Sequence, residues 1–94
     1  MSHSIYVIHM PPSRLGLDVC ANGSEVGSKA IHNFLERNQP LLSLHGHIHE
    51  SPETSGKWRA KLGNALCIQP GRLTPFTYVT IDLETIEFNR HIED

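Results

Sequence analysis

The sequence predicts a mixed α/β domain in which a βαβ unit is followed by antiparallel strands. An apolar β-branched segment, an amphipathic helical segment and a second apolar segment follow one another within the first 44 residues. The second half contains short strand-like segments separated by turn residues. A chain of 94 residues can form one domain with a modest core, so we treat residues 1–94 as a single domain or part of one.

The first strand is predicted at Ile5–Ile8, a β-branched and aromatic run. It ends at His9, because the prolines at positions 11 and 12 cannot continue a central strand. Residues 13–27 are rich in glycine, serine and asparagine, which predicts a long loop.

A helix is predicted between Glu25 and Asn38, where apolar residues recur every three or four positions. Ser24 or Ser28 could cap its start, and Pro40 prevents its continuation. The apolar run Leu41–Leu44 then predicts a strand covered on both faces. Because a helix connects the two strands, we expect them to be parallel and joined by a right-handed crossover.

The second half is predicted to consist of hairpins. Gly63-Asn64 and Leu83-Glu84 have the composition of tight connections, and Pro70-Gly71 ends a strand in a turn. We expect these antiparallel hairpins to complete the sheet. The predicted strands are Trp58–Lys61, Ala65–Gln69, Phe76–Asp82 and Thr85–Arg90.

Three histidines, His45, His47 and His49, alternate directly after the second strand. Side chains two apart on an extended backbone face the same way, so His47 and His49 can address one point or two adjacent points. His9 ends the first strand, and parallel strands bring their carboxyl ends to one edge. Imidazole binds zinc, iron, manganese and nickel. We therefore predict a metal site formed by His9, His47 and His49, with Gly46 allowing a sharp turn.

Composition excludes several classes of function. Eight basic and ten acidic residues give a formal net charge of −2, and the basic residues are too scattered to indicate a nucleic-acid-binding surface. No apolar run reaches the ~18 residues of a membrane span, and no signal peptide is evident, so we expect a soluble, cytoplasmic protein without a membrane partner. Cys20 and Cys67 are far apart, which argues against a disulfide framework, and Cys67 lies in an apolar run and should be buried.

Three motifs occur along the chain, and they are His9-Met10-Pro11-Pro12, Gly46-His47-Ile48-His49 and Ile68-Gln69-Pro70-Gly71. Their order and spacing resemble the C-terminal half of the calcineurin-like metallophosphoesterases, in particular their small cyclic-nucleotide phosphodiesterase-related branch. The resemblance covers nearly all of the chain. It implies half of an αββα sandwich, a dinuclear centre of divalent or trivalent iron, manganese or zinc at the strand ends, and a phosphate-ester small molecule as substrate.

By this resemblance, His9 and His47 would bind the second metal ion and His49 would contact the first. Ions held by imidazoles polarise a phosphoryl oxygen and lower the pKa of a bridging water, which makes it nucleophilic. Gln69 stands where the family usually has asparagine and would shape the pocket wall. No side chain is assigned a catalytic role of its own, and none is assigned to an organic cofactor.

The motifs that precede these in the family, Asp-x-His, Gly-Asp and Gly-Asn-His, do not occur in this sequence. They normally supply the bridging aspartate and most ligands of the first metal, so the chain resembles half of an active site. Asp18, Glu25 and Glu50 are available carboxylates, but none stands at a bridging position. Half of a sandwich would expose a sheet edge and an apolar face, so we expect self-association or pairing with a missing N-terminal half.

Three interpretations of function follow. The first is that the chain belongs to a metal-dependent phosphoesterase that hydrolyses phosphomonoesters or phosphodiesters with a metal-activated water. Alternatively, it is a catalytically incomplete module that binds a single zinc ion through His9, His47 and His49. A third interpretation is a remnant fold that acts through assembly. Activity would require further aspartate and asparagine residues from an upstream segment or a partner.

Other polar residues have ordinary structural interpretations. His45 is expected to be structural or to support a neighbouring metal ligand, rather than to bind metal itself. Ser28 and Lys29 at the helix start could hold an anion, although capping alone explains the serine. Asp18 could approach a substrate or orient a histidine, or be a solvated loop residue. The histidines expected to face solvent are His3, His32 and His91, and the aromatic residues expected in the core or at an interface are Trp58 and Phe76.

Overall fold

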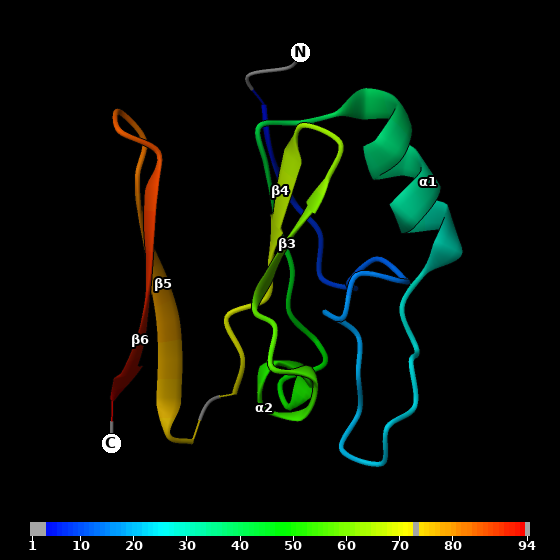
Figure 1. Ribbon diagram of the computed structural model, residues 1–94, viewed down its shortest axis with the longest axis vertical. Helices are drawn as coiled ribbons and strands as arrows, with labels where there is room; N and C mark the ends of the chain where they lie inside the picture. The colour runs from blue at the N-terminus through cyan, green and yellow to red at the C-terminus, as the bar shows by residue number, and fades with distance from the viewer. Residues whose placement is uncertain (1–3, 73, 94) are drawn as a thin grey trace.

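The computed structural model describes residues 4–72 and 74–93. Figure 1 shows helix α1 on one side of a four-stranded sheet and the β5–β6 hairpin on the other. No helix in the described ranges is long and apolar enough to cross a membrane. The elements are β1 Ile5–Val7, α1 Lys29–Asn38, β2 Leu42–Leu44, α2 Ser51–Ser55, β3 Arg59–Leu62, β4 Ala65–Ile68, β5 Phe76–Asp82 and β6 Glu87–Glu93.

The main sheet has the strand order β1-β2-β4-β3. Strands β1 and β2 are parallel, with Val7 opposite Leu44, and β2 and β4 are also parallel. Strand β3 pairs antiparallel with β4 across the predicted Gly63-Asn64 hairpin. The predicted mixed α/β fold and the parallel pairing of the first two strands are therefore confirmed. Parallel pairing places the carboxyl ends of β1, β2 and β4 at one edge.

Helix α1 begins at Lys29, four residues later than the predicted Glu25. Glu25 instead forms a β-bridge within the loop, and the Gly27 N–H donates to Asp18 Oδ2 at 2.8 Å. Ser28 is extended and its Oγ accepts a first-turn N–H at 3.1 Å, so it is the cap. Hydrogen bonds of the loop thus compete successfully with helix formation before Ser28.

The β5–β6 hairpin corrects the expectation that all hairpins complete one sheet, because it forms a separate two-stranded sheet. Strand β6 begins at Glu87 rather than Thr85, because the connection occupies residues 83–86. Asp82 Oδ1 accepts the N–H groups of Glu84 and Thr85, at 2.9 and 3.2 Å, which stabilises this longer turn.

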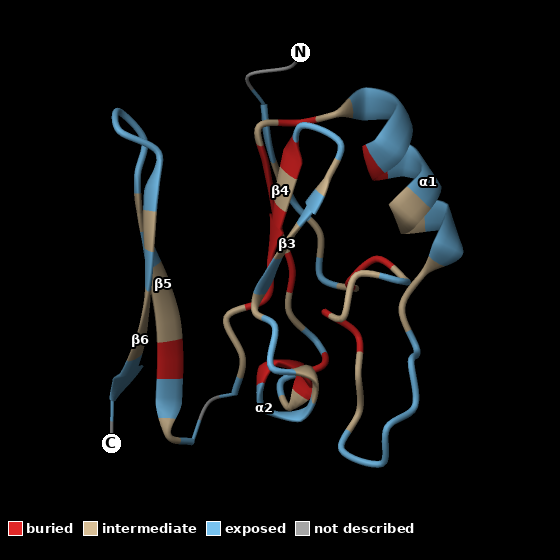
Figure 2. Ribbon diagram, viewed as in Figure 1, coloured by how far each residue is buried: buried red, intermediate tan, exposed pale blue. Residues whose placement is uncertain are grey.

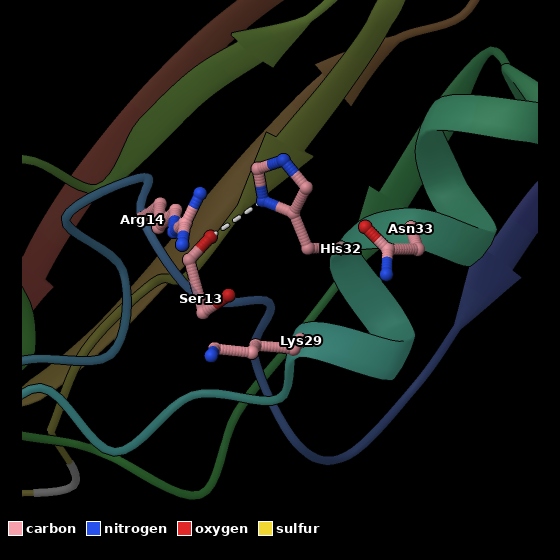
Figure 3. A pocket seen from close by; sticks show the side chains of 5 residues that line it. All are labelled: Ser13, Arg14, Lys29, His32 and Asn33. Atoms are coloured by element: carbon pink, nitrogen blue, oxygen red, sulfur yellow. Dashed lines mark hydrogen bonds between the residues drawn. The ribbon is translucent and has the colours of Figure 1, made fainter.

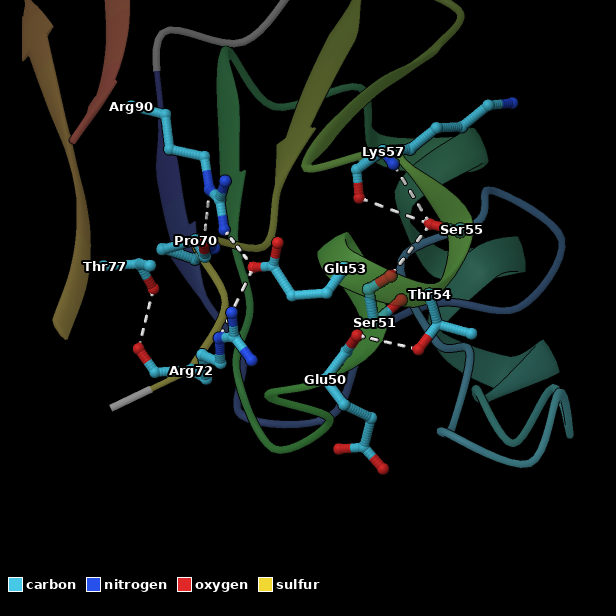
Figure 4. Close-up of polar contacts among 10 residues, drawn as sticks. All are labelled: Glu50, Ser51, Glu53, Thr54, Ser55, Lys57, Pro70, Arg72, Thr77 and Arg90. Atoms are coloured by element: carbon cyan, nitrogen blue, oxygen red, sulfur yellow. Dashed lines mark hydrogen bonds and ion pairs between the residues drawn. The ribbon is translucent and has the colours of Figure 1, made fainter. Parts of the chain in front are cut away.

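Arg90 attaches the hairpin to the rest of the molecule (Figure 4). Its Nε donates to the Pro70 carbonyl at 2.8 Å, and its Nη2 lies 2.7 Å from Glu53 Oε1 on α2. Arg72 approaches the same carboxylate oxygen at 3.9 Å. The Arg90 contacts are half-buried and charge-assisted, so they determine where the second sheet lies relative to α2.

The core lies between α1 and the main sheet. Leu17, Leu35 and Cys67 are fully buried there, and buried residues concentrate on β2, β4 and the α1 face toward the sheet (Figure 2). The predicted burial of Cys67 is confirmed, and desolvation raises the pKa of its thiol to about 11. The thiol is therefore protonated and unreactive at neutral pH.

The short helix α2 was not predicted from the sequence, because five residues show no apolar periodicity. Ser51 is fully buried, and its Oγ accepts from the Val19 N–H at 2.9 Å and donates to the Gly16 carbonyl at 3.1 Å. Ser55 Oγ donates to the same carbonyl at 2.6 Å. Contacts with a distant loop therefore stabilise this helix.

Two of the histidines expected to face solvent are half-buried instead, and His3 lies outside the described residues. His32 Nδ1 is 2.7 Å from the Ser13 carbonyl, and the ring of His91 stacks on Tyr78 with centroids 4.8 Å apart. Each imidazole is held by a residue from another segment, which a helical or strand pattern cannot indicate.

The two aromatic residues expected in the core or at an interface differ in exposure. Trp58 is half-buried, with the Arg59 guanidinium 5.0 Å from its ring centroid. Phe76 is 50% exposed and stacks on Tyr78. Phe76 is therefore not a core residue, because it lies on the face of the hairpin opposite Thr77, which is buried.

Candidate metal site

His9 and His47 meet at the carboxyl edge of the sheet. His9 follows β1 and His47 follows β2, and pairing of these strands brings His9 Nε2 within 2.9 Å of His47 Nδ1. Their rings are 4.8 Å apart and inclined by 67°. Both side chains are exposed, so a solute can reach them. The structure therefore brings together two of the three predicted ligands from positions 38 residues apart.

The sharp turn that follows β2 is made by His47 rather than by Gly46. His47 has φ of 63°, whereas Gly46 does not have a positive φ. Gly46 instead anchors the turn, because its N–H donates to the His9 carbonyl at 3.0 Å and its carbonyl accepts from Gln69 Nε2. A side chain in the left-handed region is disfavoured and is often found at functional sites. The backbone is thus strained at the residue that presents the imidazole.

His49 is exposed and does not join this pair in a group of three. Within residues 4–72 and 74–93, no three His, Cys, Asp or Glu side chains are placed to hold a metal ion. Asp18 is buried and its Oδ2 accepts from the Gly27 N–H. Glu50 Oε2 accepts from the Ala21 N–H at 3.3 Å. The carboxylates considered from the sequence are therefore engaged elsewhere or lie apart.

The pair itself fits a transition-metal ion. Neutral imidazole nitrogens bind zinc at about 2.0–2.1 Å, so two adjacent ligands of one ion stand roughly 3 Å apart. His9 Nε2 and His47 Nδ1 are 2.9 Å apart and share an N–H···N hydrogen bond, which a metal ion bound to both nitrogens would replace. Two protein ligands leave other coordination positions for water, a substrate or further side chains.

His45 supports the segment that carries His9. It is 5% exposed, and its Nδ1 lies 3.1 Å from the carbonyls of both Ile8 and Met10, which flank His9. Because both partners are acceptors, Nδ1 carries the proton and Nε2 accepts from Ser43 Oγ at 2.5 Å. Burial lowers the pKa of His45 below its usual 6.5, so the ring is neutral at neutral pH. The prediction that His45 is structural is confirmed.

Replacing His45 by alanine should reduce the free energy of unfolding by about 2 kcal/mol, because a buried hydroxyl and two carbonyls lose their partner. Ser43→Ala removes only one of these bonds and should cost about 1 kcal/mol. Urea unfolding followed by circular dichroism measures both. Equal stabilities for the His45→Ala protein and the wild type would show that the ring does not hold the β1 end.

Gln69 is fully buried beneath the histidine turn, at the carboxyl end of β4. Its Nε2 donates to the Gly46 carbonyl, while its Oε1 has no hydrogen-bond partner among the described residues. Gln69 therefore holds the backbone of the turn that carries His47, and its expected role in a pocket wall stays a prediction. Sequence reasoning missed its contact with Gly46, and the only available signal was a polar residue ending an apolar strand.

Comparison with known proteins identifies the fold alone. No protein-family model matches the chain, and no curated protein matches it. One solved crystal structure superposes on 98% of the chain with a TM-score of 0.79 and 17% sequence identity. Protein TT1561 of Thermus thermophilus superposes on 94% of it with a TM-score of 0.63 and 22% identity. The matched regions are 34% and 33% of those chains, so this chain spans about a third of their length.

Proposed function

We propose that the chain forms part of a metal-dependent phosphoesterase in which His9 and His47 bind a metal ion. The observation that carries the proposal is the 2.9 Å approach of their ring nitrogens at the carboxyl edge of the parallel strands. The resemblance of the histidine motifs to the calcineurin-like metallophosphoesterases supports it. The substrate class would be phosphomonoesters or phosphodiesters.

Each of these residues would have a distinct role in such a site. His9 and His47 would hold one ion, and exposed His49, two positions beyond His47, would be available to a second. Bound zinc, manganese or iron supplies a Lewis acid and an activated water. His45 and Gln69 keep the two histidine-bearing segments in place through backbone carbonyls. Carboxylate ligands would come from residues outside this chain.

A catalytically incomplete metal-binding module is the second candidate. The observation that favours it is that, in the part of the chain the structure describes, no group of three metal-binding side chains forms. A dinuclear hydrolytic site needs bridging and anionic ligands, which two imidazoles do not supply. In this case the chain would bind a metal ion without turnover.

Metal titration with zinc and manganese tests the metal site that both candidates require. His47→Gly removes an imidazole and suits the left-handed backbone, so it should fold while metal affinity falls at least tenfold. His9→Ala should lose a similar factor, whereas His91→Ala, which removes a histidine from the hairpin, should leave affinity unchanged. Unchanged affinity in both site variants would refute the metal site.

Hydrolysis of p-nitrophenyl phosphate and its bis ester, with manganese added, tests activity on the same samples. Turnover that disappears in the His47→Gly protein supports the phosphoesterase. Metal binding without turnover supports the incomplete module.

Self-association is proposed on a separate observation, the exposure of strand β1. This edge strand leaves Val7 79% and Ile5 42% exposed, on the face opposite Tyr6, which packs on Phe34 of α1. Exposed apolar edge strands tend to pair with other chains. Sedimentation velocity should show assembly that Val7→Lys abolishes and Leu83→Lys, at the exposed hairpin tip, does not. A monomeric wild type would exclude self-association.

A further inference from the structure

A second candidate site lies between α1 and the loop that follows β1. It is a cavity of about 140 Å³ lined by Ser13 and Arg14 from the loop and by Lys29, His32 and Asn33 from the first turns of the helix. Figure 3 shows these five side chains around one space. None of the histidines of the candidate metal site lines it. The cavity is therefore distinct from that site.

The cavity is positively charged. Arg14 and Lys29 both line it, and neither forms an ion pair with any described residue. No carboxylate lines the cavity, and the nearby Glu36 lies 3.6 Å from His32 Nε2. The positive end of the ten-residue helix α1 adds to this charge, because Lys29 is its first residue. Both side chains and the helix terminus thus favour an anion.

The hydroxyl of Ser13, beside the cavity, has no hydrogen-bond partner among the described residues. Its Oγ is buried, although buried hydroxyls nearly always have such a partner. The backbone at this residue is fully engaged, because its N–H donates to the Ser28 carbonyl at 3.1 Å and its carbonyl accepts from His32 Nδ1 at 2.7 Å. The loop is therefore held against the helix, and the Ser13 hydroxyl beside the cavity has unused hydrogen-bonding capacity.

We propose that this cavity binds a phosphate group. The lining offers a guanidinium, an ammonium, a hydroxyl and an amide as donors, with no carboxylate to repel an anion. A volume of about 140 Å³ is large enough to accommodate one phosphate group. The group can be inorganic phosphate or the phosphate of a small ester, since both present the same oxygens. The proposal does not depend on the phosphoesterase function.

Titration of the ¹⁵N-labelled chain with inorganic phosphate, followed by NMR at constant ionic strength with EDTA present, tests this site. Saturable shifts are expected at the amides of residues 13–14 and 29–33. Arg14→Gln/Lys29→Gln should weaken phosphate binding at least tenfold, because both cations are lost. Arg37→Gln/Lys61→Gln removes the same charge from the far end of α1 and from β3, and should change affinity less than twofold. His47→Gly should bind phosphate as the wild type does.

Two further ligands define the chemistry. Glycerol phosphate binding more tightly than inorganic phosphate identifies the ester as the source, and weaker binding identifies the free ion. Acetate binding as tightly as phosphate would overturn the assignment. Shifts that are absent, that persist in Arg14→Gln/Lys29→Gln, or that centre on His9 and His47 would also overturn it. Unchanged amide positions elsewhere in each variant confirm that it is folded.

Discussion

Gly27→Ala is expected to reduce the free energy of unfolding by roughly 3 kcal/mol, because the added methyl group overpacks its surroundings. A Cβ at Gly27 would lie 2.6 Å from the Pro12 carbonyl oxygen and 2.7 Å from Asp18 Oδ2. Neither atom can move freely, because Pro12 is buried and bridged to Ser28, and Asp18 is buried and bonded to the Gly27 N–H. The backbone must therefore shift.

Gly23→Ala is the matched control for this change. Glycine 23 has φ of 87° with nothing within 4 Å of the added Cβ, so only backbone strain of about 1 kcal/mol is expected. Urea unfolding of the two variants compares a steric clash with strain alone. Equal losses would mean that the loop around Gly27 yields without cost. Because Pro12 is close to His9 in the chain, Gly27→Ala should also weaken metal binding.

Leu35→Ala is expected to reduce the free energy of unfolding by about 3 kcal/mol, through lost burial and the cavity it leaves. Leu35 is fully buried with Leu17 and Cys67 at the centre of the core. Its neighbour Phe34 is 39% exposed, so Phe34→Ala should cost less than half as much. Thermal or urea unfolding checks both. A larger loss at position 34 would place the core on a different face of α1.

The elements that were predicted correctly depend on local signals. The β-branched run at β1, the apolar run at β2 and the proline that ends α1 are properties of neighbouring residues, and the parallel pairing follows from the helix between the strands. The same signals did not decide whether Ser24 or Ser28 caps the start of α1. The choice of Ser28 depends on Asp18, which binds the Gly27 N–H from nine residues away.

Elements without a local signal came only from the structure. Helix α2 is too short for periodicity and depends on the Gly16 carbonyl, 35 residues from Ser51. The β5–β6 hairpin has clear strand patterns, but nothing in them shows that it forms its own sheet. Its position depends on Arg90, which contacts Pro70 and Glu53. Contacts between side chains and distant segments produce no periodic pattern in the sequence.

At the candidate site, the order of the residues was enough to place His9 and His47 at the carboxyl ends of adjacent parallel strands, because strand direction follows from the order of elements. Three further features emerged from the folded chain. The ring nitrogens approach to 2.9 Å, His47 takes the left-handed conformation, and His45 binds the carbonyls flanking His9. These features depend on hydrogen bonds between the ends of two strands that are distant in the sequence. The residue pattern of a single strand does not contain that information.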